Sequence, residues 1–295
     1  MRTFAAVGAT ISLFAAWLVF AATPTAQLPP LNSQPSNVQL PGKFIWFDLA
    51  TPAIADQQNF YASVFDWTFE SAVRTDDGYV LIKNRGRSIA GMFHHVPPDG
   101  EQDGATWIAL MSVVDPDSTS ATVKANGGSV NVAPADVAGR GRHAVFLDPA
   151  GAVFGVLRSD SGDPFDEEIA VGGIIWVDLF ARDVEKMAQF YSSLAPFEIA
   201  DRDITAEVSR KVLSAHGMPR AGIIPVDEEA NRSAWVPYVR VDDIAATLEK
   251  VLAGGGFAIV PPDENLHDGN VAVFVDPNGG VTGIVKFEYA EDSSQ

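Results

Sequence analysis

Two acidic residues each follow a tryptophan by two positions in short runs of alternating, β-favouring residues. Asp48 follows Trp46, and Asp178 follows Trp176. Side chains two apart on a strand point to the same face, so each carboxylate should share a surface with an indole ring. Such a carboxylate could bind a polar group of a ligand, act as a general base or supply one metal ligand. It could equally cap the following helix or accept backbone N–H groups at a strand end.

The histidines show no metal-binding spacing. They are His94, His95, His143, His216 and His267. Neither His-x-x-x-His nor His-x-Glu occurs, and the adjacent pair His94 and His95 must point to opposite faces of a strand. If the first half of the chain performs chemistry, the pair to test first is Asp48 with His94. A divergent site could also use His143.

Composition excludes several classes of chemistry. The cysteine count is zero, which excludes disulfides, thiol nucleophiles and thiolate metal sites. The formal net charge is −18 with 20 Lys and Arg residues, so a nucleic-acid-binding surface is not expected. No nucleophile elbow, phosphate loop or dinucleotide-binding glycine motif is present.

The chain repeats itself once, at an offset of about 130 residues. The repeated phrases include Trp46–Leu49 with Trp176–Leu179, Phe60-Tyr61 with Phe190-Tyr191, Ala90-Gly91 with Ala221-Gly222, and Asp148-Pro149 with Asp276-Pro277. Solenoid repeats have units of about 20–50 residues, so this period is that of a duplicated domain.

Each copy is expected to contain two βαβββ units. In the first copy the expected strands are 43–49, 68–72, 79–83, 88–94, 107–114, 129–133, 143–147 and 152–158. One helix is expected to begin at Thr51-Pro52, with Thr as N-cap and Pro in the first turn, and another to span Pro116–Asn126. Asp77-Gly78 and Arg85-Gly86 are typical of turns between strands.

These motifs resemble the vicinal oxygen chelate superfamily of glyoxalases, bleomycin-resistance proteins and extradiol dioxygenases. The phrases that carry the resemblance stand at 46–49, 60–67 and 141–151, and it covers about 43–158 and 172–288. It implies an α+β fold of two tandem domains that pack as an intramolecular pseudo-dimer. Each domain would pair two βαβββ units into a curled mixed sheet with the helices outside, and chemistry would lie in the cup of the sheet.

The resemblance also implies a metal site that this sequence does not reproduce. Active members hold a divalent metal with ligands from the first strand, the first strand of the second unit and a Glu of the last strand. Carried over, these positions fall at or near Trp46, Ile108 and Gly155, and at or near Trp176, Val236 and Gly283. We therefore expect no cofactor, with a divalent metal as the alternative.

Four tryptophans fall at matched positions of the two copies. They are Trp46, Trp107, Trp176 and Trp235. We expect them, with Asp178, to line the cups, and aromatic, apolar cups suit a flat organic ligand. They would belong to the core or to the cup wall, and the alternative is that they stack on a cofactor.

The N-terminus indicates export. Arg2 precedes an uncharged apolar stretch at 3–22, so residues 1–22 are predicted to be a signal peptide or an uncleaved membrane anchor, with a buried helix as a third interpretation. The predicted location is periplasmic or extracellular. The expected remainder is a Pro-rich linker at 23–42, domains at 43–158 and 171–289, an acidic linker at 159–170 and an acidic tail at 290–295.

Two function classes follow. The first is an exported protein that binds a small, aromatic or apolar organic ligand in a cup without the usual metal ligands. The second is a divergent metal-dependent lyase, isomerase or dioxygenase in which domain 1 is the active copy. A scaffold whose cups are merely filled is a third interpretation.

Overall fold

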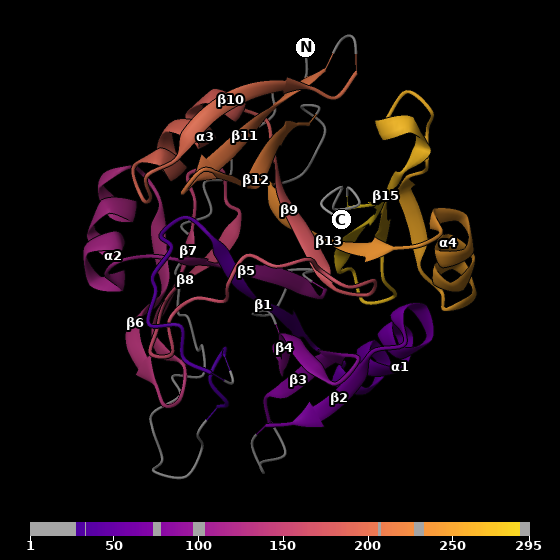
Figure 1. The fold of residues 1–295 in the computed structure, drawn as a ribbon, viewed down its shortest axis with the longest axis horizontal. Coiled ribbons are helices and arrows are strands. Elements are labelled where there is room, and N and C mark those ends of the chain that lie inside the picture. The colour runs from indigo at the N-terminus through magenta and orange to yellow at the C-terminus, as the bar shows by residue number, and fades with distance from the viewer. Residues whose placement is uncertain are drawn as a thin grey trace, which may run out of the picture.

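The structure is a computed structural model that describes residues 28–32, 34–72, 78–96, 104–205, 208–226 and 233–289. Two eight-stranded mixed sheets, one from each half of the chain, form its body (Figure 1). Sheet A has the order β2 (Thr68–Ser71), β3 (Val80–Asn84), β4 (Arg87–His94), β1 (Phe44–Thr51), β5 (Thr106–Ser112), β8 (Val153–Ser159), β7 (Gly141–Leu147) and β6 (Ser129–Val137).

Sheet B repeats this topology. Its order is β10 (Glu198–Asp203), β11 (Ser209–Ala215), β12 (Met218–Pro225), β9 (Ile174–Ala181), β13 (Ala234–Val241), β16 (Val281–Lys286), β15 (Val271–Val275) and β14 (Phe257–Val260). In each sheet the first strands of the two units pair antiparallel at the centre, and each also pairs in parallel with the last strand of its own unit. The predicted fold class, two tandem domains of paired βαβββ units, is confirmed.

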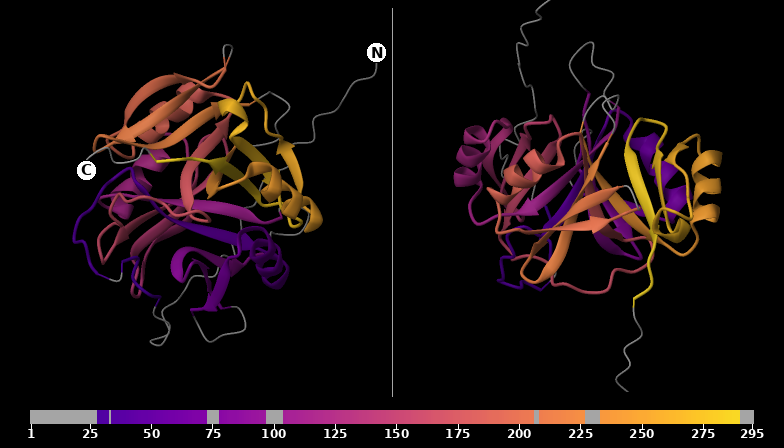
Figure 2. Two further views of the ribbon diagram at one scale, coloured as in Figure 1. Left: turned by 45° about the vertical axis from the view of Figure 1, so that its right-hand side comes forward. Right: turned by 90° about the horizontal axis from the view of Figure 1, so that it is seen from above.

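Within the described residues, four α-helices cover the outer faces of the curled sheets. They are α1 (Ile54–Phe65), α2 (Pro116–Ala125), α3 (Val184–Ser192) and α4 (Ile244–Ala253). Figures 1 and 2 show α1 beside α4 and α2 beside α3, so each helix pair joins the two halves of the chain. The pairing agrees with an intramolecular pseudo-dimer.

The predicted start of α2 is confirmed and that of α1 is wrong. Asp115 caps α2 through the N–H groups of Asp117 and Ser118, and Pro116 occupies its first turn. Thr51 instead continues β1, where it pairs with His94 of β4, and α1 begins at Ile54 without a side-chain cap. The parallel pairing with β4 extends the strand past the residue that the N-cap pattern favoured.

One hydrophobic core lies between the two domains. It includes side chains from both sheets and buries α1 and α3 along one side, with Tyr61 and Tyr191 at 0% exposure. Tyr61 of α1 donates to Asp276 of domain 2, and Tyr191 of α3 donates to Asp148 of domain 1, at 2.9 and 3.0 Å. The repeated Phe-Tyr and Asp-Pro phrases therefore hold the two domains together.

The described part of the predicted Pro-rich linker packs against domain 1. We call residues 28–42 the strap. Its backbone donates from Leu28 to Ala138 and from Ser36 to Ser161, and Asp163 accepts from the Leu40 N–H and the Ser112 hydroxyl. Asp163 is 1% exposed, so the middle of the predicted acidic linker is covered by the strap.

The predicted signal or anchor at 1–22 and the acidic tail at 290–295 lie outside the described residues. Among the helices that the structure describes, none is long and apolar enough to cross a membrane.

Candidate functional site

The face of each sheet opposite the shared core is the inside of its curl. We call these faces cup 1, in sheet A, and cup 2, in sheet B. Trp46 and Ala50 of β1 belong to the apolar cluster of cup 1, whereas Phe47 and Leu49 belong to the shared core. Asp48 therefore points into cup 1, as its strand parity predicts.

Asp48 is held by an indole and a phenol. Trp46 Nε1 donates to Asp48 Oδ1 at 2.9 Å and lies 2.8 Å from the Tyr79 hydroxyl, which also donates to Asp48. The Arg140 guanidinium lies 3.9 Å from the centre of the Trp46 ring. Burial raises the pKa of the Asp48 carboxyl, and the Tyr79 bond, the Arg140 charge and the Trp46 bond oppose this rise.

Cup 2 contains the same four chemical groups. Asp178, 2% exposed, accepts from Trp176 Nε1 at 2.7 Å and from the Tyr238 hydroxyl. Arg210 Nη1 lies 3.8 Å from Asp178 Oδ1, and its guanidinium lies 5.4 Å from the centre of the Trp176 ring. Burial raises the pKa of the Asp178 carboxyl, while the Arg210 charge and both hydrogen bonds lower it.

The phenol and the guanidinium come from different positions in the two copies. Tyr79 and Arg210 occupy corresponding positions. Tyr79 lies two residues before Leu81, which pairs with Gly91, and Arg210 lies two residues before Val212, which pairs with Gly222. Tyr238 of β13 corresponds instead to Leu110 of β5, since these residues pair with Gly283 and Gly155. Arg140 enters cup 1 from the β6–β7 turn.

A glycine beside each carboxylate makes this arrangement fit. Gly91 and Gly222 pair with Asp48 and Asp178 on the neighbouring strand. A Cβ atom at Gly91 would lie 1.8 Å from the Tyr79 hydroxyl, and one at Gly222 would lie 2.1 Å from Asp178 Oδ1. The glycine of the repeated Ala-Gly phrase is thus explained, because the Tyr79 and Asp48 side chains occupy the space above Gly91 and the Asp178 side chain that above Gly222.

The structure does not bring His94 to Asp48. His94 is exposed at the end of β4 and has the parity of Met92, which faces the shared core, so the two predicted catalytic residues lie on opposite faces of sheet A. His143 does have cup 1 parity, opposite Leu157, and burial lowers the pKa of its imidazole. The donor partner that the buried Asp48 requires is Tyr79, which sequence reasoning missed.

Two of the four predicted cup tryptophans are not in the cups. Trp107 and Trp235, each 3% exposed, belong to the shared core. Trp107 Nε1 of domain 1 donates to Thr282 of domain 2 at 3.0 Å, and Trp235 Nε1 donates within domain 2 to the Tyr191 hydroxyl at 2.8 Å. Their strand parity is opposite to that of Ile108 and Val236, so the prediction that they line the cups is wrong.

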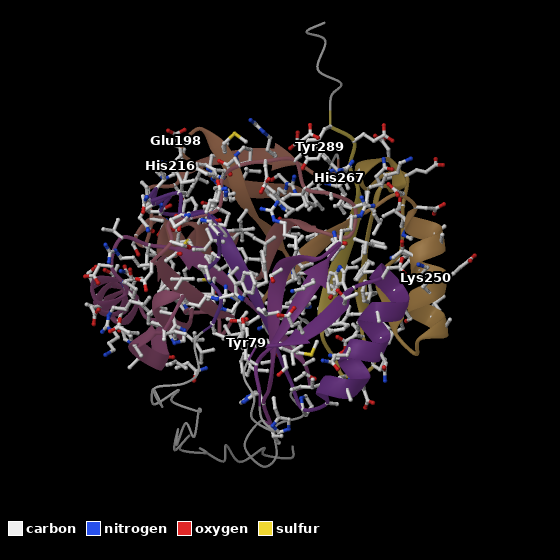
Figure 3. All side chains as sticks on the ribbon, turned by 60° about the horizontal axis from the view of Figure 1, so that its bottom comes forward. Tyr79, Glu198, His216, Lys250, His267 and Tyr289 are labelled. Carbon is white, nitrogen blue, oxygen red and sulfur yellow. The ribbon has the colours of Figure 1, made fainter. Side chains whose placement is uncertain are left out.

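The two cups differ in how far they are filled. In cup 1 Trp46 is 6% exposed and the strap residue Leu28 is buried against the apolar wall, in which Phe93 and three valines are partly buried. In cup 2 the corresponding Trp176 is partly exposed, as are Phe180 and several valines around it. Figure 3 shows Tyr79 beside the strands of sheet A and His267 over those of sheet B.

A separate cavity of about 190 Å³ lies beside α2, outside both cups. The one ionisable residue that lines it is Asp115, whose carboxylate already caps α2. The other polar side chains that line it are the hydroxyls of Ser118, Thr119, Thr122 and Ser193.

Comparison with known proteins agrees with this geometry. Residues 43–156 match the model of the glyoxalase/bleomycin resistance protein/dioxygenase superfamily. The anthracycline biosynthesis protein DauV of a Streptomyces species is 30% identical over 268 residues, which are 85% of this chain and 95% of that protein. This chain belongs to the glyoxalase/bleomycin resistance protein/dioxygenase superfamily.

The chain is also similar to a second curated protein and to a solved structure. The anthracycline biosynthesis protein DnrV of Streptomyces peucetius is 30% identical over 83% of this chain and 94% of its own length. The Mn(II)-bound glyoxalase of Novosphingobium aromaticivorans has the same fold, with a TM-score of 0.53 and 18% identity over 88% of this chain and 87% of that one.

The residues present do not fit the three-ligand metal centre of the superfamily. The resemblance implies a Glu at Gly155. Gly155 pairs with Leu110, which in turn pairs with Trp46, and neither side chain can bind a metal ion. A Cβ atom at Gly155 would lie 2.7 Å from Leu110 Cγ. At Gly283 it would lie 2.3 Å from the Tyr238 ring. In the described part of the chain no group of three His, Cys, Asp or Glu residues is arranged to hold a metal ion.

Proposed function

We propose that this chain is an exported binding protein that holds a small, flat, mainly apolar organic molecule in cup 2 without a divalent metal. The observation that carries the proposal is the partly exposed apolar wall of Trp176, Phe180 and neighbouring valines around a polar floor. Aromatic and aliphatic walls with a few polar groups are typical of small-molecule sites.

Two further observations support cup 2 over cup 1. The strap residue Leu28 already packs against the wall of cup 1, so a ligand there would compete with the chain itself. The relatives DauV and DnrV are named for anthracycline biosynthesis, and flat aromatic molecules of that kind suit a wall of rings and valines.

Export rests on residues 1–22, where Arg2 precedes the apolar stretch. N-terminal sequencing of the native protein tests it. A start near residue 23 or a membrane-bound full chain supports export, and a free cytoplasmic chain that begins at Met1 refutes it.

The metal-dependent enzyme in domain 1 is the less supported alternative. Its predicted histidine His94 lies on the outer face of sheet A, and the carboxylate Asp48 is engaged by Trp46 and Tyr79. Asp48→Asn, if Asp48 had a catalytic role, would abolish turnover at little cost in stability.

The binding proposal is tested with two matched phenylalanines. Phe180 of cup 2 and Phe93 of cup 1 are both partly buried against their cup clusters. With naphthalene as the probe in calorimetry, we expect Phe180→Ala to weaken binding about tenfold or more, since that apolar contact is lost. Phe93→Ala should leave the dissociation constant within about twofold. Equal effects of the two variants, or a larger effect of Phe93→Ala, would contradict cup 2 as the site.

A further inference from the structure

Arg210 is a cationic side chain at the floor of cup 2 with a donor that the protein does not satisfy. Its Nη1 faces Asp178 at 3.8 Å, and its side chain is 21% exposed. Its Nε is buried and has no hydrogen-bond acceptor within the described structure. A buried donor without a partner costs about 1–3 kcal/mol, so such groups normally have an acceptor.

Cup 1 contains the same unsatisfied group, built from a different part of the fold. Arg140 is 5% exposed, and its Nε and Nη1 are buried without an acceptor in the described residues. It reaches the Trp46 ring from the β6–β7 turn, whereas Arg210 reaches Trp176 from β11. Leu28 of the strap is buried against the wall of cup 1, and Arg210 is the more exposed of the two arginines, so Arg210 is the guanidinium that a ligand would meet.

The charges around Arg210 favour a neutral partner. The Asp178 carboxylate opposes the guanidinium at close range, so the pair together carries little net charge. His267 lies at the same side of the cup, and burial and the Arg210 charge both lower the pKa of its imidazole, which keeps it neutral near pH 7. An anionic ligand would be repelled by Asp178, and the chain as a whole carries a formal charge of −18.

Asp178 already accepts from two donors inside the protein, Trp176 and Tyr238. Arg210 is the cationic donor at this floor, and its side chain is partly exposed. Partly exposed rings and valines surround it. A ligand that accepts a hydrogen bond from the Arg210 guanidinium and also packs against these side chains needs an oxygen acceptor on a flat, apolar body.

We propose that Arg210 donates a hydrogen bond to a carbonyl oxygen of a neutral, flat ligand, such as an aryl ketone or a quinone, bound in cup 2. This inference rests on the proposed binding function and names the chemical class of its ligand. Hydrogen bonds from a charged donor are about twice as strong as neutral ones, so the carbonyl should dominate selectivity.

The test compares three probes on the full chain by calorimetry: naphthoquinone, naphthalene and naphthoate. The chain has no cysteine, so the quinone cannot form thiol adducts. We expect naphthoquinone to bind at least about tenfold more tightly than naphthalene, and naphthoate to bind no better than naphthalene. Arg210→Met should weaken naphthoquinone binding about 10- to 100-fold and leave naphthalene binding within about twofold.

Arg140→Met is the matched control, because it removes the equivalent guanidinium from the strap-covered cup. It should leave the binding of all three probes within about twofold. Equal affinity for naphthoquinone and naphthalene on the unmodified chain would overturn the inference and leave the binding function standing, whether or not Arg210→Met folds. Tightest binding of naphthoate would replace the neutral class by an anionic one. Failure of all three probes to bind would overturn the proposed function itself.

Discussion

Tyr191→Phe is expected to lower the free energy of unfolding by about 2–4 kcal/mol, roughly twice the loss expected for Tyr61→Phe. Both hydroxyls are buried and donate to an aspartate of the other domain. Their surroundings differ in what remains after the hydroxyl is removed. The difference between the two losses therefore measures the free-energy cost of the polar atoms left without a partner, apart from the loss of one hydrogen bond.

Removal of the Tyr191 hydroxyl takes a partner from two buried atoms, although Asp148 Oδ1 still accepts from the N–H groups of Ala150 and Ala152. Asp148 Oδ2 loses its side-chain donor, and Trp235 Nε1 loses its acceptor. In the other half of the interface, Asp276 Oδ2 still accepts from Gln57 Nε2 at 2.9 Å, and Trp107 Nε1 still donates to Thr282. Tyr61→Phe should thus cost about 1–2 kcal/mol.

Urea denaturation followed by tryptophan fluorescence measures both variants. Because the two domains share one core, a single cooperative transition is expected for each. Equal losses for the two variants, or a neutral Tyr191→Phe, would show that these tyrosines do not stabilise the domain interface in the way described.

Gly91→Ala is expected to destabilise the chain by about 3 kcal/mol, the upper part of the range for overpacking a buried site. The added methyl group would lie 1.8 Å from the Tyr79 hydroxyl and 2.3 Å from Asp48 Oδ1, so the hydrogen-bonded floor of cup 1 must move. Gly155→Ala is the control in the same cup. Its methyl group would meet Leu110 Cγ at 2.7 Å, and a leucine side chain can yield at a cost of about 1 kcal/mol.

The same urea transitions report this pair of variants. An unchanged free energy of unfolding for Gly91→Ala would mean that Asp48 and Tyr79 do not form their hydrogen bond above Gly91. A Gly155→Ala variant that loses more stability than Gly91→Ala would mean that the space beside Leu110 is the tighter of the two.

Much of the fold could be predicted because the same motifs occur in both halves of the sequence. The repeated phrases at 46–49 and 176–179 gave the duplication, and turn signals such as Arg85-Gly86 separated the strands. The parity of Asp48 with Trp46 was enough to direct both into cup 1. These are local properties of the chain, which need no knowledge of what lies opposite.

Trp107 was misassigned because β5 is buried on both faces. Ile108 and Leu110 face cup 1 while Trp107 and Met111 face the shared core, and all four are apolar. Alternation of polar and apolar residues cannot show the direction of a strand that is apolar throughout. Only the register with β1, in which Trp107 pairs with Leu49, settles its direction.

The partners of the two carboxylates were missed because they come from other strands. Tyr79 approaches Asp48 across Gly91, and Arg140 arrives from a turn nearly 100 residues later. Comparison of the repeats also hid them, since it aligns Tyr79 with Arg210. The repeated Ala-Gly phrase was the available signal, because a glycine fixed beside an aspartate indicates a side chain that crosses it.

Ligand binding without a divalent metal is tested by elemental analysis of the native protein, purified without added metal. The same sample is titrated with naphthoquinone before and after treatment with a chelator. We expect less than about 0.1 mole of zinc, iron, nickel or manganese per mole of chain, and the same dissociation constant, within about twofold, before and after the chelator. Near-stoichiometric metal whose removal abolishes binding would contradict metal-free binding at the Asp178 and Arg210 floor of cup 2.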